Sequence, residues 1–161
     1  MALKADRYEE STDISHFYNE GVATRGGLVV LDAALASGAA MDQGVNLVKY
    51  AQATATDVPV GVLLNDVVNK DLTRTHLNQY KDEVQKGGKV TVLTRGWVVT
   101  NNITGNPSPG DVAYLDETTA GNVVNGTDLG ATSGAMAVGR FMTNQDSDGY
   151  AKLYVNLPNL G

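Results

Sequence analysis

One pattern occurs twice in the sequence and limits what the chain can fold into. An apolar run ends in Leu31-Asp32, passes through small, turn-prone residues, and is followed by PVGVLL at residues 59–64. A second apolar run ends in Leu115-Asp116 and is followed, after a Gly turn, by AVGRFM at residues 137–142. Each half therefore predicts a strand, a turn, a strand, a linker and a further strand with a Val-Gly pair. Two copies are too few for a solenoid. We expect two matching halves of one small closed sheet, in which each Val-Gly lets a strand bend.

The composition agrees with a fold of many short strands. The chain has 161 residues, 18 of them Gly, and Val, Thr, Asn and Gly dominate its second half. Turn signals recur roughly every 8–12 residues, which is typical of a barrel or a sandwich. We predict a mainly β fold, a small β-barrel or barrel-like sandwich with an N-terminal arm and one short helical or loop excursion. The predicted boundaries are an arm at 1–20 and a single β-barrel domain at 21–161, with halves at about 21–64 and 89–157 and the excursion at 65–88.

The first twenty residues differ from the rest of the chain. They hold two basic and five acidic residues, and apolar residues are sparse before Ile14, Phe17 and Tyr18. Such a segment buries little against its own domain. We therefore expect an arm that is either loose or docked on a neighbouring molecule. Two adjacent aromatic residues on such an arm need a foreign surface, so Phe17 and Tyr18 are the first candidates for a partner interface.

The further candidates for contact with a partner are Leu77, Tyr80 and Trp97. Leu77, Tyr80 and Val84 are spaced as one face of a short helix, which Gly87-Gly88 would end, although an irregular excursion also fits. This helix could face a partner through Leu77 and Tyr80 or pack on the barrel, and the sequence leaves both open. Trp97, the only Trp, follows Gly96 in a Val-rich strand and could fill the core or form an interface.

The residues that could carry chemistry have simpler structural roles. NQDSDG at 144–149 matches the first half of a calcium loop, but Val155 stands where the bidentate acid is needed, so a hairpin turn is favoured. The chain has no Cys, no nucleophile elbow and no phosphate loop. We therefore expect no enzyme, no metal and no cofactor. The polar candidates that we interpret as turn, cap or surface residues are Asp32, Asp42, Asp111, Asp116, His16 and His76.

The net charge narrows the possible partners. It is −6, and an acidic surface repels phosphate backbones, so we expect no direct contact with nucleic acid. No apolar stretch is long enough for a membrane helix, and the N-terminus lacks the features of a secretion signal. A carbohydrate-binding module is a second class to consider, because Tyr150 and Tyr154 would share a strand face with Lys152, and Tyr114 is a third candidate for stacking on a sugar.

The order and spacing of several stretches resemble a known family. These stretches cover most of residues 21–157: GVATRGGLVVLD, DVPVGVLLNDV, KDEVQKGGKVTVLTRGWVV, SPGDVAYLD, NVV, AVGRF and YAKLYVNL. They resemble the small β-barrel decoration (cement) proteins of tailed-bacteriophage heads. The resemblance implies a non-enzymatic virion protein on the outer face of the capsid, often a homotrimer, which binds the major capsid protein and stabilises contacts between its subunits. The alternatives are a carbohydrate-binding module or another structural barrel of the virion, such as a tail component.

Overall fold

The chain is described from a computed structural model, which covers residues 3–21, 23–33, 46–50, 57–66, 83–84, 86–128 and 136–157. Within these residues the chain forms strands and no helix, so the prediction of a mainly β fold is confirmed. In particular, no helix in this part of the chain is long and apolar enough to span a membrane. The strands are β1 Leu3–Asp13, β2 Phe17–Tyr18, β3 Ala23–Thr24, β4 Leu28–Leu31, β5 Leu47–Lys49, β6 Pro59–Asp66, β7 Glu83–Val84, β8 Val90–Thr100, β9 Ile103–Thr104, β10 Val112–Leu115, β11 Val123–Asn125, β12 Ala137–Phe141 and β13 Ala151–Asn156.

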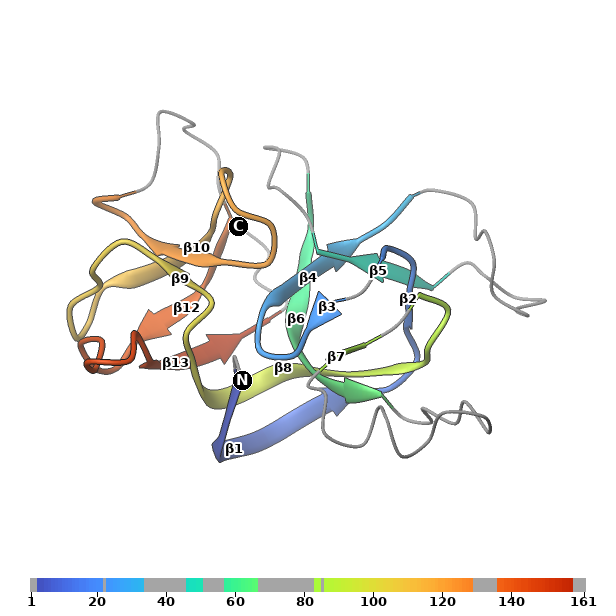
Figure 1. Ribbon diagram of the computed structural model, residues 1–161, viewed down its shortest axis with the longest axis horizontal. Coiled ribbons are helices and arrows are strands. Elements are labelled where there is room, and N and C mark those ends of the chain that lie inside the picture. The colour runs from blue at the N-terminus through green and yellow to red at the C-terminus, as the bar shows by residue number, and fades with distance from the viewer. Residues whose placement is uncertain are drawn as a thin grey trace.

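Ten of these strands form two sets with the same order. The first strand set is β2-β5-β4-β6-β8, and the second strand set is β9-β11-β10-β12-β13. In each set the first two strands are parallel and all later neighbours are antiparallel. Figure 1 shows the two sets beside each other, with β8 running along both. The repeated sequence pattern therefore has a matching repeat in the strand order, although the matching strands begin at β2 and β9 rather than at the predicted starts of the halves.

The strand register repeats as well. Val29 lies opposite Gly61 in the first set, and Ala113 lies opposite Gly139 in the second, with the register shifting after each pair. A Cβ at Gly61 would lie 2.2 Å from the carbonyl oxygen of Leu93, and one at Gly139 would lie 1.8 Å from that of Tyr154. No Cβ fits at such distances, so both Val-Gly pairs allow the next strand to approach closely.

The first strand set closes on itself as a small barrel. Tyr18 N–H donates to the Gly88 carbonyl (3.0 Å), Gly87 N–H donates to the Tyr18 carbonyl (2.7 Å), and Phe17 bridges Lys89. These contacts join β2 to the start of β8. The two-stranded antiparallel sheet of β3 and β7 lies against this barrel, because Ala23 and Val84 belong to its core. Val84, which the sequence places on a helix face, is thus a buried strand residue, while Leu77 and Tyr80 lie outside the described residues.

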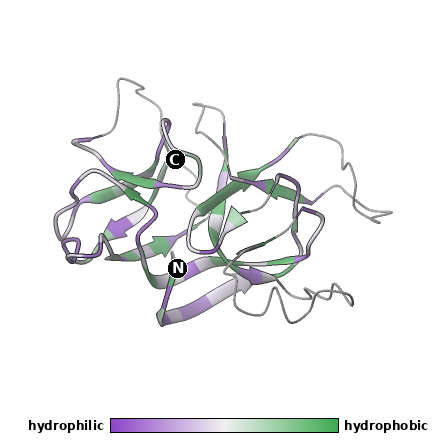
Figure 2. Ribbon diagram, viewed as in Figure 1, coloured by the Kyte–Doolittle hydropathy of each residue, from purple (hydrophilic) through white to green (hydrophobic). Residues whose placement is uncertain are grey.

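The N-terminal segment pairs with its own chain, whereas the sequence predicts an arm that is either loose or docked on a neighbouring molecule. β1 pairs antiparallel with β8 from Val92 to Thr100, on the edge opposite to the one that β6 and β13 share. Its side chains are mostly exposed, and Figure 2 shows it as largely hydrophilic. The expectation of low burial was sound, but backbone hydrogen bonds to the chain's own longest partner strand hold the segment in place, and sequence composition does not report such bonds.

Each strand set has two faces, because side chains alternate along a strand. We call the face of the first set that points into its own barrel the inner face, and the opposite face the outer face. The inner face of the first set packs with Tyr18, Ala23 and Val84 in one core cluster. The outer face of the first set packs in a second cluster with the inner face of the second set. The inner faces consist of Val29, Val48, Leu63 and Val92 in the first set, and of the equivalent Ala113, Val123, Phe141 and Leu153 in the second. The outer face of the first set consists of Leu28, Val30, Val62, Leu64 and Leu93.

The two sets are therefore stacked head to tail, with the outer face of the first on the inner face of the second. The outer face of the second set is left without a covering layer among the described residues. We call it the open face. Its members, equivalent by register to the buried outer residues of the first set, are Val112, Tyr114, Arg140, Met142 and Tyr154.

Candidate partner-binding face

The repeated Leu-Asp motif closes a loop in each strand set and has a structural role. Asp32 accepts a hydrogen bond from Asn19 Nδ2 (2.9 Å), and Asp116 accepts one from the Thr104 hydroxyl. Asn19 directly follows β2, and Thr104 occupies the equivalent place in β9. The backbone N–H of each aspartate also donates to an equivalent carbonyl, at 2.9 Å for Asp32 and 3.0 Å for Asp116. The two aspartates thus fasten the same strand end in both copies.

Asp116 also shows why this carboxylate stays ionised. Its Oδ1 accepts hydrogen bonds from the Thr118 N–H and hydroxyl, both at 2.7 Å. Burial would raise the pKa of Asp116, but the hydrogen bonds from Thr104 and Thr118 outweigh burial and lower this pKa below its ordinary value. A carboxylate stabilised in this way is a poor proton acceptor, so the motif is suited to fixing a loop rather than to acid–base chemistry.

The predicted hairpin turn at 144–149 is confirmed. Asp146 accepts hydrogen bonds from the backbone N–H groups of Asp148 (3.0 Å) and Tyr150 (2.8 Å), and it forms an ion pair with Lys4 (2.7 Å). Gly149 adopts a φ of 82°. Hydrogen bonds, with that from Lys4 the largest cause, lower the pKa of Asp146. Its oxygens are therefore engaged by the turn itself. Across the residues that the structure describes, no group of three or more acidic or histidine side chains is placed to hold a metal.

Asp111 and His16, the other polar candidates within the described residues, are not brought together in one site. Asp111 accepts the Ser108 N–H at 2.8 Å, which caps a turn. His16 is mostly buried, with its Nε2 3.3 Å from Asp13. Asp42 and His76 lie outside the described residues.

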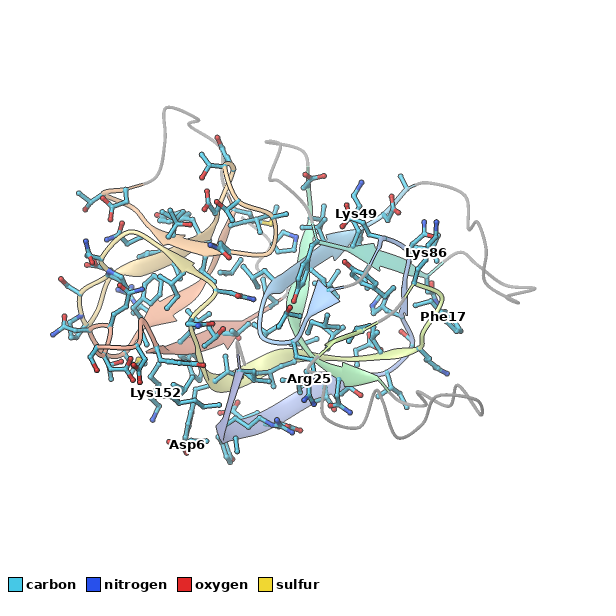
Figure 3. All side chains as sticks on the ribbon, viewed as in Figure 1. Asp6, Phe17, Arg25, Lys49, Lys86 and Lys152 are labelled. Carbon is cyan, nitrogen blue, oxygen red and sulfur yellow. The ribbon has the colours of Figure 1, made fainter. Side chains whose placement is uncertain are left out.

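The structure separates the residues that were predicted to contact a partner. Tyr18 is only 1% exposed and meets Tyr50 edge-on, with ring centroids 5.9 Å apart. It therefore belongs to the core of its own chain and is not available to a partner. Phe17 is half-buried, with Lys89 5.8 Å from its ring. Figure 3 places Phe17 and Lys152, the neighbour of Trp97, at opposite ends of the molecule, so Phe17 and Trp97 do not form one patch.

Trp97 is half-buried and belongs to a row of outward side chains. Lys152 Nζ lies 3.6 Å from the centre of its ring, a cation–π contact. Trp97 lies opposite Tyr8 on one side and Tyr154 on the other. Paired residues of antiparallel strands share a face, and the pairing continues across β12 and β10. The row is Tyr8, Trp97, Tyr154, Arg140 and Val112.

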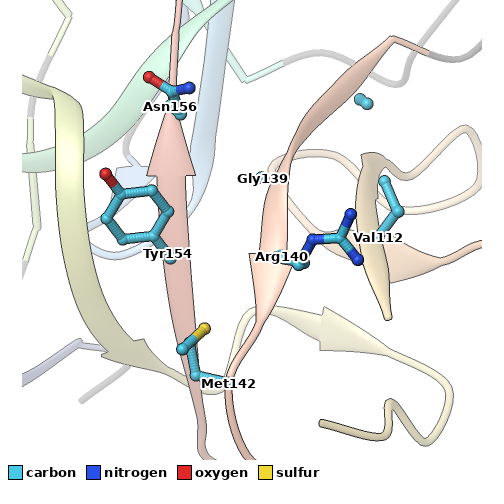
Figure 4. Close-up of a pocket in the computed structure, with 7 residues that line it drawn as sticks. Val112, Gly139, Arg140, Met142, Tyr154 and Asn156 are labelled. Atoms are coloured by element: carbon cyan, nitrogen blue, oxygen red, sulfur yellow. The ribbon is translucent and has the colours of Figure 1, made fainter. Parts of the chain in front are cut away.

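The open face contains a pocket of about 530 Å³. Figure 4 shows Tyr154 and Arg140 on neighbouring strands, with Met142 toward one end and Asn156 toward the other. Arg140 Nη1 donates to the Gly110 carbonyl at 2.6 Å, which holds the guanidinium over the pocket. The lining is Val112, Ala137, Gly139, Arg140, Met142, Tyr154 and Asn156, so it is largely apolar and includes one cation and no carboxylate.

Sequence analysis missed Arg140 and Met142, although a signal for them is present. The segments PVGVLL and AVGRFM are equivalent strands of the two sets. At equivalent positions, Val62 is replaced by Arg140 and Leu64 by Met142. An apolar residue in one set and a charged residue at the equivalent position of the other indicate that the two faces have different surroundings.

Comparisons with known proteins place the chain in a family. A search of curated proteins finds no match. The sequence model of the family described as structural cement protein (E217 gp24/Pam3 gp6) matches residues 10–156. This match spans β2 to β13, hence both strand sets, and includes only the end of β1, from residue 10 onward. The chain therefore belongs to the structural cement proteins of phages, and its location is the virion capsid.

Proposed function

We propose that this protein binds the outer surface of a tailed-phage head and stabilises contacts between subunits of the major capsid protein, as a homotrimer. The observation that carries the proposal is the family match over residues 10–156, which spans both strand sets. The acidic charge of −6 supports an outer position, away from packaged nucleic acid.

The fold supports a mechanical role. One of the two core clusters contains residues of both strand sets, which supports a rigid body rather than two hinged parts. A rigid oligomer that touches several shell subunits at once gains from effective concentration, because binding at one patch holds the others in place. Each bound copy then raises the free energy needed to separate the subunits that it bridges.

The side chains support a role without catalysis. The best candidates for acid–base work, Asp32 and Asp116, fasten loops. A carbohydrate-binding role receives less support, because cations already cover aromatic rings that a sugar would use. Lys4 Nζ lies 4.2 Å from the Tyr150 ring centre, and Lys152 covers Trp97.

The test is binding to shells. Expanded capsids that contain the major capsid protein, prepared without this protein, would be mixed with the purified chain, sedimented and imaged. We expect saturable co-sedimentation, ordered added density on the outer surface, and a higher temperature of shell disassembly. A protein that stays in the supernatant at all concentrations, with shells of unchanged stability, would contradict the proposal.

A further inference from the structure

We propose that the open face is the surface that contacts the shell, and that it binds an acidic segment of the major capsid protein. This inference rests on the proposed function and adds to it the contact surface and the chemistry of the partner. The segment presents a carboxylate to Arg140 and an apolar side chain to the pocket between Val112, Met142 and Tyr154.

The first argument is the contrast between equivalent faces. The outer face of the first strand set is wholly buried, with Leu28, Val62 and Leu64 all inaccessible to solvent. The equivalent residues of the open face are partly or fully exposed, and Met142 is 50% exposed. The outer face of the first set is thus covered by the second set, whereas no layer of the described residues covers the equivalent face of the second set.

The second argument is the kind of residues on the open face. If this face were only a solvated outer surface, small polar and charged residues would suffice there. It has instead Tyr114, Arg140, Met142 and Tyr154, and its row continues to Trp97. Tyr, Trp, Met and Arg are the residue types that are enriched at protein–protein interfaces and that dominate their binding energy.

The third argument is charge complementarity. The chain is acidic overall, yet the pocket lining has Arg140 and no carboxylate. Lys152, on the same face of β13 as Tyr154, adds a second cation nearby. Among the described residues, Arg140 donates one hydrogen bond to the Gly110 carbonyl, which leaves further N–H groups of its planar guanidinium for a carboxylate from outside.

The same charge argues against a two-fold contact between copies of this chain. A two-fold axis that passes at the pocket would bring the Arg140 of one copy close to the Arg140 of the other. Like charges in a contact cost free energy unless an anion intervenes. An acidic segment of the shell protein meets the same face without that cost.

The test uses charge reversal at matched positions. Arg140→Glu and Arg7→Glu change the net charge equally, but Arg7 lies on β1 opposite Val98, on the other side of the sheet from Tyr8 and Trp97. Arg140→Glu should weaken binding to expanded shells roughly tenfold or more, and Arg7→Glu should change it by less than about threefold. Both residues are surface side chains, so both variants should keep the wild-type melting temperature and the wild-type mass by light scattering.

The apolar part of the site has its own pair of variants. Met142→Asp puts a carboxylate into the pocket, while Val58→Asp alters an apolar residue just before β6 that is 45% exposed. Only Met142→Asp should weaken shell binding. In addition, carbodiimide treatment of an Arg140→Lys variant on shells should join residue 140 to an Asp or Glu of the major capsid protein.

The outcomes separate this inference from the proposed function. Wild-type protein that fails to bind shells overturns the proposed function. Wild-type binding that Arg140→Glu and Met142→Asp leave intact overturns the open face as the contact surface. A lower oligomer mass for these variants, or a cross-link only between copies of this chain, also overturns it, because the face would then join copies to each other.

Discussion

The two strand sets have the same order, directions and register, yet their outer faces meet different surroundings. The outer face of the first set lies on the inner face of the second. Two identical modules stacked in this head-to-tail way always leave one inner face and one outer face unmatched. Here the unmatched inner face is filled by Tyr18, Ala23 and Val84, whereas the unmatched outer face carries Arg140 and Met142. Duplication thus supplies a core and a free surface from one pattern.

The largest expected effect on folding stability comes from truncation to alanine at one of two equivalent positions, Leu64 and Met142. Leu64→Ala removes a fully buried side chain from the shared core and should cost about 2–5 kcal/mol of unfolding free energy. Met142→Ala, at the equivalent exposed position, should cost about 0.5 kcal/mol or less. Urea denaturation of both variants checks the difference. Equal losses would mean that the two outer faces are equally covered in the free protein.

The paired glycines should give the next largest effect. Gly61→Ala and Gly139→Ala would each push a methyl group against a backbone carbonyl, and each should destabilise the fold by about 1–3 kcal/mol or more. Gly21→Ala is the matched control, because no atom lies within 4 Å of a Cβ there. Thermal and urea unfolding would measure all three. If only one of Gly61 and Gly139 proved sensitive, the equivalence of the two sets would be broken.

Asp116→Asn should have a smaller, pH-dependent effect. The pKa of Asp116 is lowered in the folded protein relative to its ordinary 3.8, so its ionised form contributes stability above that value. This contribution is lost as the pH falls through the folded pKa. At pH 7 we expect the variant to be about 1–2 kcal/mol less stable, and the gap to the wild type should shrink below about pH 4. Denaturation curves at several pH values test this, and a gap that is constant down to pH 2 would contradict it.

The smallest effect concerns the cation–π contact of Trp97, in the row that continues from the open face. Lys152→Met keeps the length of the side chain but removes the cation above Trp97. The loss of folding stability should be about 0.5–1 kcal/mol. Since Trp97 is the only tryptophan, its fluorescence spectrum reports the change directly. An unchanged spectrum and unchanged stability would show that the contact does not persist in solution.

Much of the fold could be predicted because it follows from local patterns. The strand periodicity, the turn residues and the repeated Leu-Asp and Val-Gly pairs all lie within short windows. In the structure the Leu-Asp pairs mark the ends of β4 and β10, and the Val-Gly pairs lie in β6 and β12. The pairing of β1 with β8 could not be predicted in this way. Its residues are polar and its partner is far along the chain, so neither composition nor periodicity indicates the contact.

The candidate site was predicted only in part, for a related reason. Trp97 was a candidate and lies in the row that continues from the open face, but Tyr18 is a core residue. Which face of a strand is covered depends on how the two sets stack, and a single strand does not reveal this. Comparison of Val62 with Arg140 shows the difference between the copies, but its meaning becomes clear only once Val62 is found buried against the second set.

Hydroxyl-radical footprinting of the protein, free and bound to expanded shells, tests the central claim most directly. It measures the solvent exposure of individual side chains, including Leu64 and Met142 at equivalent positions. In the free protein we expect modification of Met142 and Tyr154 and none of Leu64. On the shell, Met142 and Tyr154 should become protected, while exposed Val58 stays reactive. Reactive Leu64 in the free protein, or Met142 that remains equally reactive on the shell, would contradict the head-to-tail stack with one open, shell-binding face.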